Sequence, residues 1–316
     1  SYMVYTNNVP CGSYRAPGQP QVVFAVESHT DMIAKELGID PYELRLRNVV
    51  RDGQVCATGA RYNNIRGEET LRAVAEASKW TSPKSNPFIG KGMSLSQRPQ
   101  GQSIYSAKVE MDETGKTTLH LLVPETGTGS HTVGRQMVAE DLGIPVEEVI
   151  AMQMNTDAGT FDSGAGSGSS VGGTHAALGA AQGVRRKLTL MAAEFYGWPE
   201  ENIQFQKGRV FVEGDPEKGV SLKELAARTV KALGETISAD ISTTSEEPDV
   251  TCFSAQVAEV EVDPETGNVK LRKFITAHDV GTIHNPITHQ GQIDGAVVQG
   301  FGYALMEELL ADEGQI

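Results

Sequence analysis

The hydrophobic positions of the chain follow helical spacing in several segments. Apolar residues over 24–37 recur at helical spacing, and Gly38 is expected to end this helix. A short helix is expected over 42–48, because Asp40 can cap it and Pro41 suits its first turn. The same spacing predicts further helices over 71–79, 173–196, 222–233 and 293–308, and a helix through Met137 to Leu142 that Ser130 or Thr132 can cap.

Alternation of apolar and polar residues predicts strands in other segments. Two hairpins are expected, one with strands 105–111 and 117–123, the other with strands 257–262 and 269–275. Their turns, DETG and DPETG, are nearly the same, and each hairpin precedes an expected helix. We interpret this as a duplicated strand–turn–strand–helix unit. A strand over 149–154 and a small hairpin over 204–212 complete the pattern.

Hairpins separated by helices favour an α+β fold, with mixed sheets packed by helices, over a doubly wound parallel sheet. Two polar stretches, 81–102 and 237–249, are interpreted as connections, the second as a domain boundary. Three regions are therefore expected: a helical connecting region over 1–95, an α+β subdomain over 96–240, and a second one over 241–316.

Composition and charge narrow the functional classes. The 316 residues carry a net charge of −14, which disfavours nucleic acid and anionic membranes as partners. No apolar run is long enough to span a membrane, and the first residues do not resemble a signal peptide. The three cysteines, Cys11, Cys56 and Cys252, form no CxxC pair, so a zinc site or an iron–sulfur cluster is not expected here. Three widely spaced cysteines do not suit a disulfide framework, which favours a reducing compartment. A cytoplasmic protein is therefore expected.

Three segments rich in Gly or Pro are candidates for ligand binding. The loop CGSYRAPGQPQ presents Arg15 on a stiff backbone, which suits an anion or oxygen ligand, although a surface arginine on a turn has the same pattern. The turn PETGTGSH leads into a helix, where its amides can bind negative charge. The segment 162–173 combines hydroxyls and amides before a second helix, which favours a phosphate site over a flexible linker.

Histidines near the C-terminal end suggest a metal site at first sight. His278, His284 and His289 lack a recognisable ligand spacing, so we interpret them as structural. The glycine-rich segments are not a P-loop, because no GK[ST] follows them. The absence of a lysine or an acidic metal ligand from these loops also disfavours an unrelated phosphate-dependent enzyme.

Taken together and in order, these segments resemble the molybdenum hydroxylases, the group of xanthine dehydrogenase, aldehyde oxidase, nicotinate dehydrogenase and carbon monoxide dehydrogenase. The loop SYRAPGQPQ is similar to the family's Phe-Arg-Gly-x-Gly-x-Pro-Gln, and GTGSHT is similar to its Gly-Gln-Gly-x-His-Thr. The order is continued by NTD at 155–157, the Gly/Ser segment, DVG at 279–281 and VQG at 298–300. The resemblance covers nearly the whole chain.

The resemblance implies a molybdenum centre held by a molybdopterin, in the cytosine dinucleotide form, with no protein side chain bound to the metal. It implies hydroxylation of an electron-poor carbon, in a nicotinate-like N-heterocycle or an aldehyde, with oxygen from water. Electrons would pass to iron–sulfur clusters and FAD on partner chains. The expected partners are an iron–sulfur subunit, an FAD subunit and another molybdopterin-binding subunit.

The resemblance also assigns roles to residues. Arg15 would lie beside the molybdenum ligands, Gln299 near the metal, and Tyr14 and Pro17 in the substrate pocket. The turn that contacts the pterin would comprise Gly127, Thr128, Gly129 and Ser130. The segment that holds the cofactor phosphates would comprise Gly166, Ser167, Gly168, Ser169 and Ser170.

Three departures from the family pattern matter. Thr128 stands where relatives carry Gln, and Pro17 stands where purine-oxidising relatives carry an aromatic ring. The Gly-Glu-Pro element, whose glutamate is the family's general base, is not found in this sequence. The favoured explanation for the missing element is a large subunit that is split between two genes. The other explanation is that the sequence is a fragment. These departures also keep open a cofactor-free structural or assembly subunit.

Overall fold

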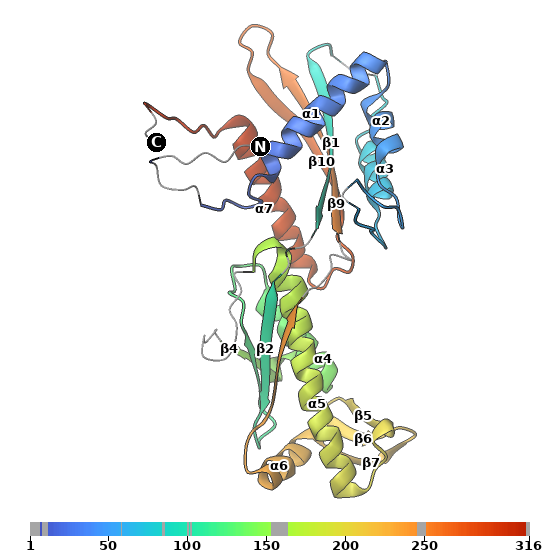
Figure 1. Cartoon of the computed structure of the whole chain (residues 1–316), viewed down its shortest axis with the longest axis vertical. Helices are drawn as coiled ribbons and strands as arrows, with labels where there is room; N and C mark the ends of the chain where they lie inside the picture. The colour runs from blue at the N-terminus through green and yellow to red at the C-terminus, as the bar shows by residue number, and fades with distance from the viewer. Residues whose placement is uncertain are drawn as a thin grey trace. The chain divides into compact units, whose positions relative to one another are not determined.

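The chain folds into two compact units, each with its own sheets and helices (Figure 1). The computed structural model describes residues 7, 12–57, 59–83, 86–99, 101, 103–152, 164–244 and 251–313. Unit 1 comprises the described residues within Ser1–Pro99, Asp249–Ile283 and His289–Ile316, and unit 2 those within Gln100–Pro248 and His284–Thr288. Most of the first and third expected regions thus lie together in unit 1.

Unit 1 is built on a three-stranded antiparallel sheet with the order β1-β9-β10. The expected hairpin forms β9 (Thr251–Val262) and β10 (Val269–Asp279). The expectation that 81–102 is only a polar connection is wrong, because β1 (Ile89–Pro99) lies within it. Its buried Met93 lies opposite Val257 of β9, a partner so distant in sequence that local pattern could not reveal the pairing.

Helices cover this sheet at the positions that the apolar spacing predicts. α3 (Gly67–Ala77) packs on β9 and β10 through Leu71 and Val74, which are fully buried. A Cβ on Gly67 would lie 2.9 Å from the Phe253 ring, so glycine allows the close approach at the start of α3. α1 (Gln19–Leu37) ends at Gly38, whose φ is 65°, as expected. The last helix, α7 (Pro286–Leu305), starts earlier than the expected 293, because Asn285 Oδ1 accepts a hydrogen bond from Thr288 N and caps it.

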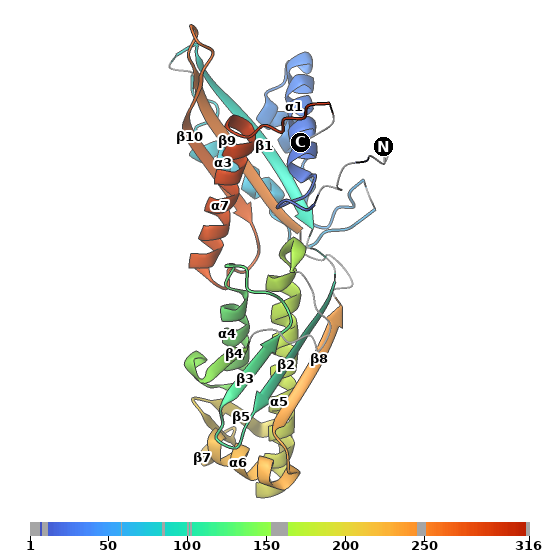
Figure 2. The same ribbon diagram turned by 90° about the vertical axis from the view of Figure 1, so that its left-hand side faces the viewer.

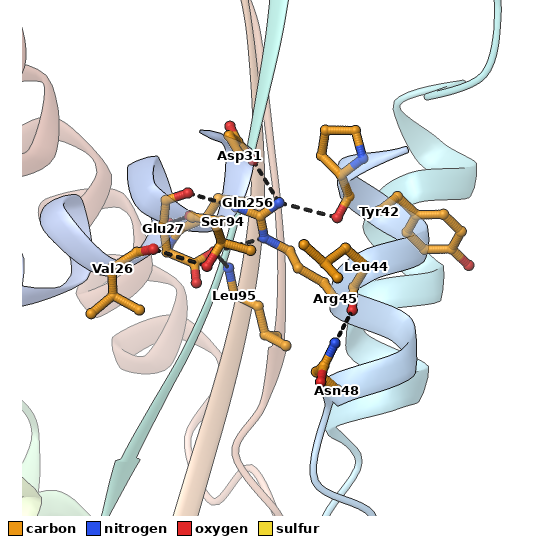
Figure 3. Close-up of polar contacts among 12 residues, drawn as sticks. Val26, Glu27, Asp31, Tyr42, Leu44, Arg45, Asn48, Ser94, Leu95 and Gln256 are labelled. Carbon is orange, nitrogen blue, oxygen red and sulfur yellow. Dashed lines mark hydrogen bonds and ion pairs between the residues drawn. The ribbon is translucent and has the colours of Figure 1, made fainter. Parts of the chain in front are cut away.

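A buried arginine joins α1, β1 and α2 (Pro41–Asn48) of unit 1 (Figure 3). Arg45 of α2 is 4% exposed and donates to Glu27 Oε2 and Asp31 Oδ1 at 2.8 and 2.7 Å. Glu27 Oε2 also accepts a 2.8 Å hydrogen bond from Leu95 N on the free edge of β1. α1 therefore protects the edge of the sheet and is itself fixed by a paired, buried charge.

Unit 2 contains a mixed four-stranded sheet with the order β4-β3-β2-β8 (Figure 2). The expected hairpin forms β2 (Ile104–Met111) and β3 (Thr117–Leu121), and β4 (Val149–Met152) runs parallel to β3. The polar stretch 237–249, expected to be a domain boundary, also contributes β8 (Ile237–Thr244), which pairs antiparallel with β2, and the division between the two units falls at the end of this stretch. Burial of Ile237 against the sheet core stabilises this strand despite its polar residues.

Two helices pack against this sheet and run parallel to each other. α4 (Ser130–Leu142) and α5 (Thr174–Tyr196) contact one another and the strands β2 and β3. A Cβ on Gly134 would lie 3.8 Å from Ala177 Cβ near the start of both helices. Further along both, Arg185 Nη1 donates to the Asp141 carbonyl at 2.7 Å. Contacts at matching positions along α4 and α5 mean that their N-termini lie at the same end.

A small three-stranded antiparallel sheet and a helix complete unit 2. The strands are β5 (Ile203–Gln206), β6 (Arg209–Val212) and β7 (Asp215–Ser221), and α6 (Leu222–Leu233) follows as predicted. The α+β class with helix-packed mixed sheets is therefore confirmed. Within the described ranges, no helix combines the length and the apolar character that crossing a bilayer requires.

Candidate functional site

The Arg15 loop of unit 1 has a constrained backbone. Ala16 has a φ of 59° and Gly18 a φ of 74°, both in the left-handed region. Gly18 is the N-cap of α1, and a proline lies in the first turn of that helix. Since α1 is held by the Glu27–Arg45 pair, the loop projects from a fixed base. Pro17, a predicted pocket residue, is exposed in this loop.

α7 holds the Arg15 loop through side chains on one face. Arg15 Nη2 donates to Gln292 Oε1 at 2.8 Å and to the Gln292 carbonyl at 3.3 Å. Gln299 Nε2 donates to the Arg15 carbonyl at 3.2 Å, and the Tyr14 ring meets the Tyr303 ring edge-on at 5.4 Å between centroids. The structure therefore brings together Arg15, Tyr14 and Gln299. Gln292, two helical turns before Gln299, was missed as a partner of Arg15, and that spacing is the signal that could have found it.

The predicted pterin turn in unit 2 contains its own anion. The Glu125 carboxylate accepts hydrogen bonds from the amides of Gly127, Gly129 and His131 at 2.9, 3.0 and 3.1 Å. Ser130 Oγ adds a fourth donor at 3.3 Å. Burial raises the pKa of Glu125, but these amide hydrogen bonds outweigh it and hold the pKa below its usual value. Sequence reasoning missed Glu125, although an acid two residues before a Gly-x-Gly turn is a visible signal.

The same turn is closed by a histidine and a packed glycine. His131 Nε2 donates to the Val123 carbonyl at 2.9 Å, so this ring serves the turn. Gly129, with a φ of 77°, is the N-cap of α4, in place of the expected Ser130 or Thr132. A Cβ on Gly129 would lie 2.7 Å from Thr288 Cγ2, so Thr288 in the first turn of α7 packs directly on this glycine. Thr128 Oγ1 is buried here without a hydrogen-bond partner among the described residues.

The predicted phosphate segment also has an unusual backbone. Ala165–Ser167 forms a 3₁₀ turn, Ser169–Gly173 a π-helical turn, and α5 continues from there. Gly166 and Ser167 both have a φ of 65°, and Gly101 N donates to the Gly166 carbonyl at 2.7 Å. Successive left- and right-handed residues direct neighbouring amides to one side. The predicted residues 153–163, including NTD at 155–157, lie outside the described residues.

Two glycines of this segment are required by packing. A Cβ on Gly168 would lie 2.2 Å from Tyr105 Oη, and a Cβ on Gly172 would lie 1.8 Å from Tyr105 Cδ2. Tyr105 of β2 is 1% exposed and belongs to the core of unit 2. These glycines therefore make room for a tyrosine, a role that the sequence pattern did not suggest.

The two predicted cofactor loops of unit 2 converge. Each leads into one of the two parallel helices, the turn at 127–130 into α4 and the segment at 164–173 into α5. A Cβ on Gly173 would lie 3.4 Å from Val123 Cγ2, and the Val123 carbonyl accepts from His131. The positive ends of two helix dipoles therefore lie near each other, beside loops rich in amides and hydroxyls.

The histidines near the C-terminal end, His278, His284 and His289, were interpreted as structural. His278 Nε2 lies 2.7 Å from Thr276 Oγ1. Burial, and then the charge of His289, lower the pKa of His278. Among the residues that the structure describes, no group of three potential ligands is arranged to hold a metal ion.

Comparison with known proteins identifies the family of this chain. Residues 1–49 and 63–316 match two families, both described as molybdopterin cofactor-binding domains. The putative xanthine dehydrogenase molybdenum-binding subunit of Escherichia coli strain K12 is 34% identical over 98% of this chain and 43% of its own length. The nicotine 6-hydroxylase large subunit of Paenarthrobacter nicotinovorans is 30% identical over 97% of this chain and 41% of its own. The chain thus spans less than half the length of these relatives.

A solved structure agrees with the sequence comparison. Quinoline 2-oxidoreductase from Pseudomonas putida 86 superposes with a TM-score of 0.88 at 26% identity, covering 98% of this chain and 43% of that protein. The Cu,Mo-CO dehydrogenase superposes with a TM-score of 0.81 at 22% identity, covering 93% of this chain and 41% of that protein, which shows a shared fold. The chain belongs to the molybdenum hydroxylase family, as a molybdopterin cofactor-binding chain.

Proposed function

We propose that unit 2 binds the cofactor through its two converging loops, and that Arg15 and Gln299 of unit 1 take part in the reaction. The observation that carries this proposal is the pair of parallel helices whose N-termini follow the two glycine-rich loops. Gly166, Ser167, Gly168, Ser169 and Ser170 would hold the phosphates, because hydroxyls, amides and the α5 dipole all favour negative charge.

The turn Gly127–Ser130 would contact the pterin. Its Thr128 hydroxyl is buried and has no partner among the described residues, so a polar group of the ring would satisfy it. Relatives carry Gln at this position, and the shorter Thr reaches less far. The cytosine dinucleotide form is part of this proposal.

When bound, the cofactor supplies a redox-active molybdenum that hydroxylates carbon with oxygen from water. Arg15 would orient a substrate or an oxygen ligand with its guanidinium, while Gln292 holds that guanidinium in place. Gln299 would fix the backbone of the same residue. Tyr14 and Pro17, both exposed, would line the substrate pocket. The general base is not among the residues identified in this chain.

The substrate is proposed to be an electron-poor N-heterocycle, with an aldehyde as the alternative. Two proteins similar to this chain are named for the oxidation of nicotine and quinoline, and another for that of aldehydes. The proposed partners are an iron–sulfur subunit, an FAD subunit and another molybdopterin-binding subunit, and the proposed location is the cytoplasm. A further relative is the gamma subunit of a dehydrogenase complex, in agreement with a multi-subunit enzyme.

A cofactor-free assembly subunit is the second candidate. It is favoured by the packing of Gly168 and Gly172 against Tyr105, since this need for glycine exists without any ligand. The two candidates differ in metal content. An assembly subunit would be isolated from active enzyme without molybdenum on this chain.

The decisive experiment measures molybdenum and pterin in the purified complex. We expect about one molybdenum per chain by plasma mass spectrometry and a cytidine nucleotide after acid release. Ser170→Glu places a negative charge at the exposed start of α5 and should lower molybdenum content about tenfold or more, through repulsion of phosphate. Ser82→Glu, at an exposed serine of unit 1, is the charge-matched control. Normal molybdenum content in Ser170→Glu would reject the phosphate assignment.

A further inference from the structure

The two parallel helices of unit 2 differ in the charge at their N-termini. The start of α4 is already occupied by the Glu125 carboxylate, through three amides and the Ser130 hydroxyl. The start of α5 is preceded by residues 164–173, which include no acidic residue. Among the described residues, no capping side chain accepts a hydrogen bond at the π-helical turn or at α5. Within that part of the chain, one helix start is therefore neutralised from within, and its neighbour is not.

This difference has a direct electrostatic consequence. A carboxylate that already accepts the amides of Gly127, Gly129 and His131 leaves those donors unavailable to a second anion. Its charge also repels a phosphate that approaches the same turn. The Thr128 hydroxyl, buried and unpartnered among the described residues, remains for a ligand, and beside the Glu125 charge it is better placed for an uncharged polar group than for a second anion.

We propose that Glu125 determines which part of the cofactor each loop accepts. It positions the Gly127–Ser130 turn, reserves that turn for an uncharged edge of the cofactor, and directs the phosphates to the start of α5. This inference rests on the proposed function, since it assigns the two loops to two parts of one ligand. Glu125 acts through the turn and is a positioning residue.

The geometry supports positioning as well as exclusion. Gly127 and Gly129 have φ values of 86° and 77°, and the carboxylate bridges the amides of both. Without it, the turn would lose four charge-assisted hydrogen bonds, three from amides and one from the Ser130 hydroxyl, while His131 Nε2 would still close it at Val123. In the Glu125→Ala variant, the Gly127–Ser130 turn should therefore be less ordered, and its amides should be free to bind another anion.

The test uses the full chain prepared without cofactor and inorganic phosphate as the probe. Amide hydrogen exchange is followed by mass spectrometry with and without phosphate. In the wild type, phosphate should slow exchange in peptides covering 164–174 and leave 127–131 unchanged. In Glu125→Ala, exchange at 127–131 without phosphate should be about tenfold faster or more, and phosphate should slow it.

Controls separate charge from folding. Glu125→Gln removes the charge but keeps one acceptor oxygen, so its exchange at 127–131 should lie between wild type and Glu125→Ala. Glu113→Ala removes an exposed glutamate in the β2–β3 turn and should match wild type. The proposal is overturned if phosphate slows exchange at 127–131 in the wild type, or fails to slow exchange at 164–174 there. It is also overturned if Glu125→Ala gains no phosphate effect at 127–131.

Molybdenum content of the assembled complex distinguishes this inference from the proposed function. Glu125→Ala should retain about a tenth of the wild-type molybdenum or less, and Glu125→Gln should retain more. Wild-type content in Glu125→Ala would overturn the positioning role. If the wild-type chain itself carries no molybdenum, the proposed function fails, whereas the exchange measurement on cofactor-free protein still decides how Glu125 acts on the turn.

Discussion

Gln299 Nε2 lies 3.2 Å from the carbonyl oxygen of Arg15, although the two residues are 284 positions apart in the chain. The Arg15 side chain is held from the same helix, by Gln292. Both ends of one arginine are thus fixed by α7, and the Tyr14–Tyr303 ring contact extends the same interface. A loop held at backbone and side chain can present a guanidinium with little loss of entropy on binding.

The first prediction concerns this backbone contact. Gln299→Ala removes a hydrogen bond worth about 1 kcal/mol, so kcat/KM of the assembled enzyme should fall about fivefold. Trypsin should cleave after Arg15 faster than in the wild type, because the loop is less firmly held. Gln290→Ala, which removes a contact to Asp294 within α7, is the matched control. Equal cleavage rates in the two variants would contradict a role for Gln299 in holding the loop.

The second prediction concerns the left-handed Ala16, whose φ is 59°. The left-handed conformation destabilises an alanine by about 1–2 kcal/mol. A glycine removes this strain, but it loses more backbone entropy on folding, which offsets part of the gain. Ala16→Gly should therefore raise the free energy of unfolding of unit 1 by about 0.5–1 kcal/mol in urea denaturation. Ala25→Gly, at an exposed helical position of α1, should lower it by about 1 kcal/mol. Two changes of the same sign would refute the assignment of strain to Ala16.

The third prediction concerns the buried arginine of unit 1. Arg45→Met should destabilise unit 1 by about 3 kcal/mol, because Glu27 keeps only its hydrogen bond from Leu95 and becomes an unpaired charge. Hydrogen exchange of the β1 amides in increasing urea measures this loss. Arg47→Met removes an exposed arginine of the same helix and should change stability by less than about 0.5 kcal/mol. Similar exchange in both variants would argue against the buried pair.

The fourth prediction concerns the contact between Gly172 and Tyr105. Gly172→Ala places a methyl group 1.8 Å from the ring, so the start of α5 must shift, at a cost of about 1–3 kcal/mol. Gly300→Ala in α7 meets no atom within 4 Å and should stabilise the chain by up to about 1 kcal/mol. Thermal unfolding compares the two. An unchanged midpoint in Gly172→Ala would show that the close contact with Tyr105 does not constrain this position.

The fifth prediction follows from the lowered pKa of His278, caused by burial and then by His289. Because the folded state resists protonation, the unfolded state binds more protons as pH falls below about 6.5. Stability should therefore fall on acidification from pH 7, by at most about 1.4 kcal/mol per pH unit for this group, until the folded pKa is passed. His278→Gln should show a shallower dependence in urea titrations between about pH 5 and 7. His29→Gln, at an exposed position, should keep the wild-type slope.

Local elements and the family were determined by the sequence itself. The helices at 222–233 and 41–48, and the hairpins closed by DETG and DPETG, depend on contacts within a few residues, so spacing and capping were sufficient to predict them. The order of the Arg15 loop, the Gly-x-Gly turn and the closing segment identified the molybdenum hydroxylases. The resemblance also assigned Arg15 and Gln299 to the metal surroundings, and these two residues are in contact, while their role at the metal stays a prediction.

Tertiary structure alone decided the features that depend on distant partners. β1 and β8 carry too few apolar residues to be recognised locally, and they are strands because β9 and β2 supply the opposite hydrogen bonds. Gly172 is a glycine because Tyr105 of β2 occupies its side-chain space, and the amides of Gly129 and His131 are taken by Glu125. Residue type states which interactions a group can make, but three-dimensional packing decides which of them it makes.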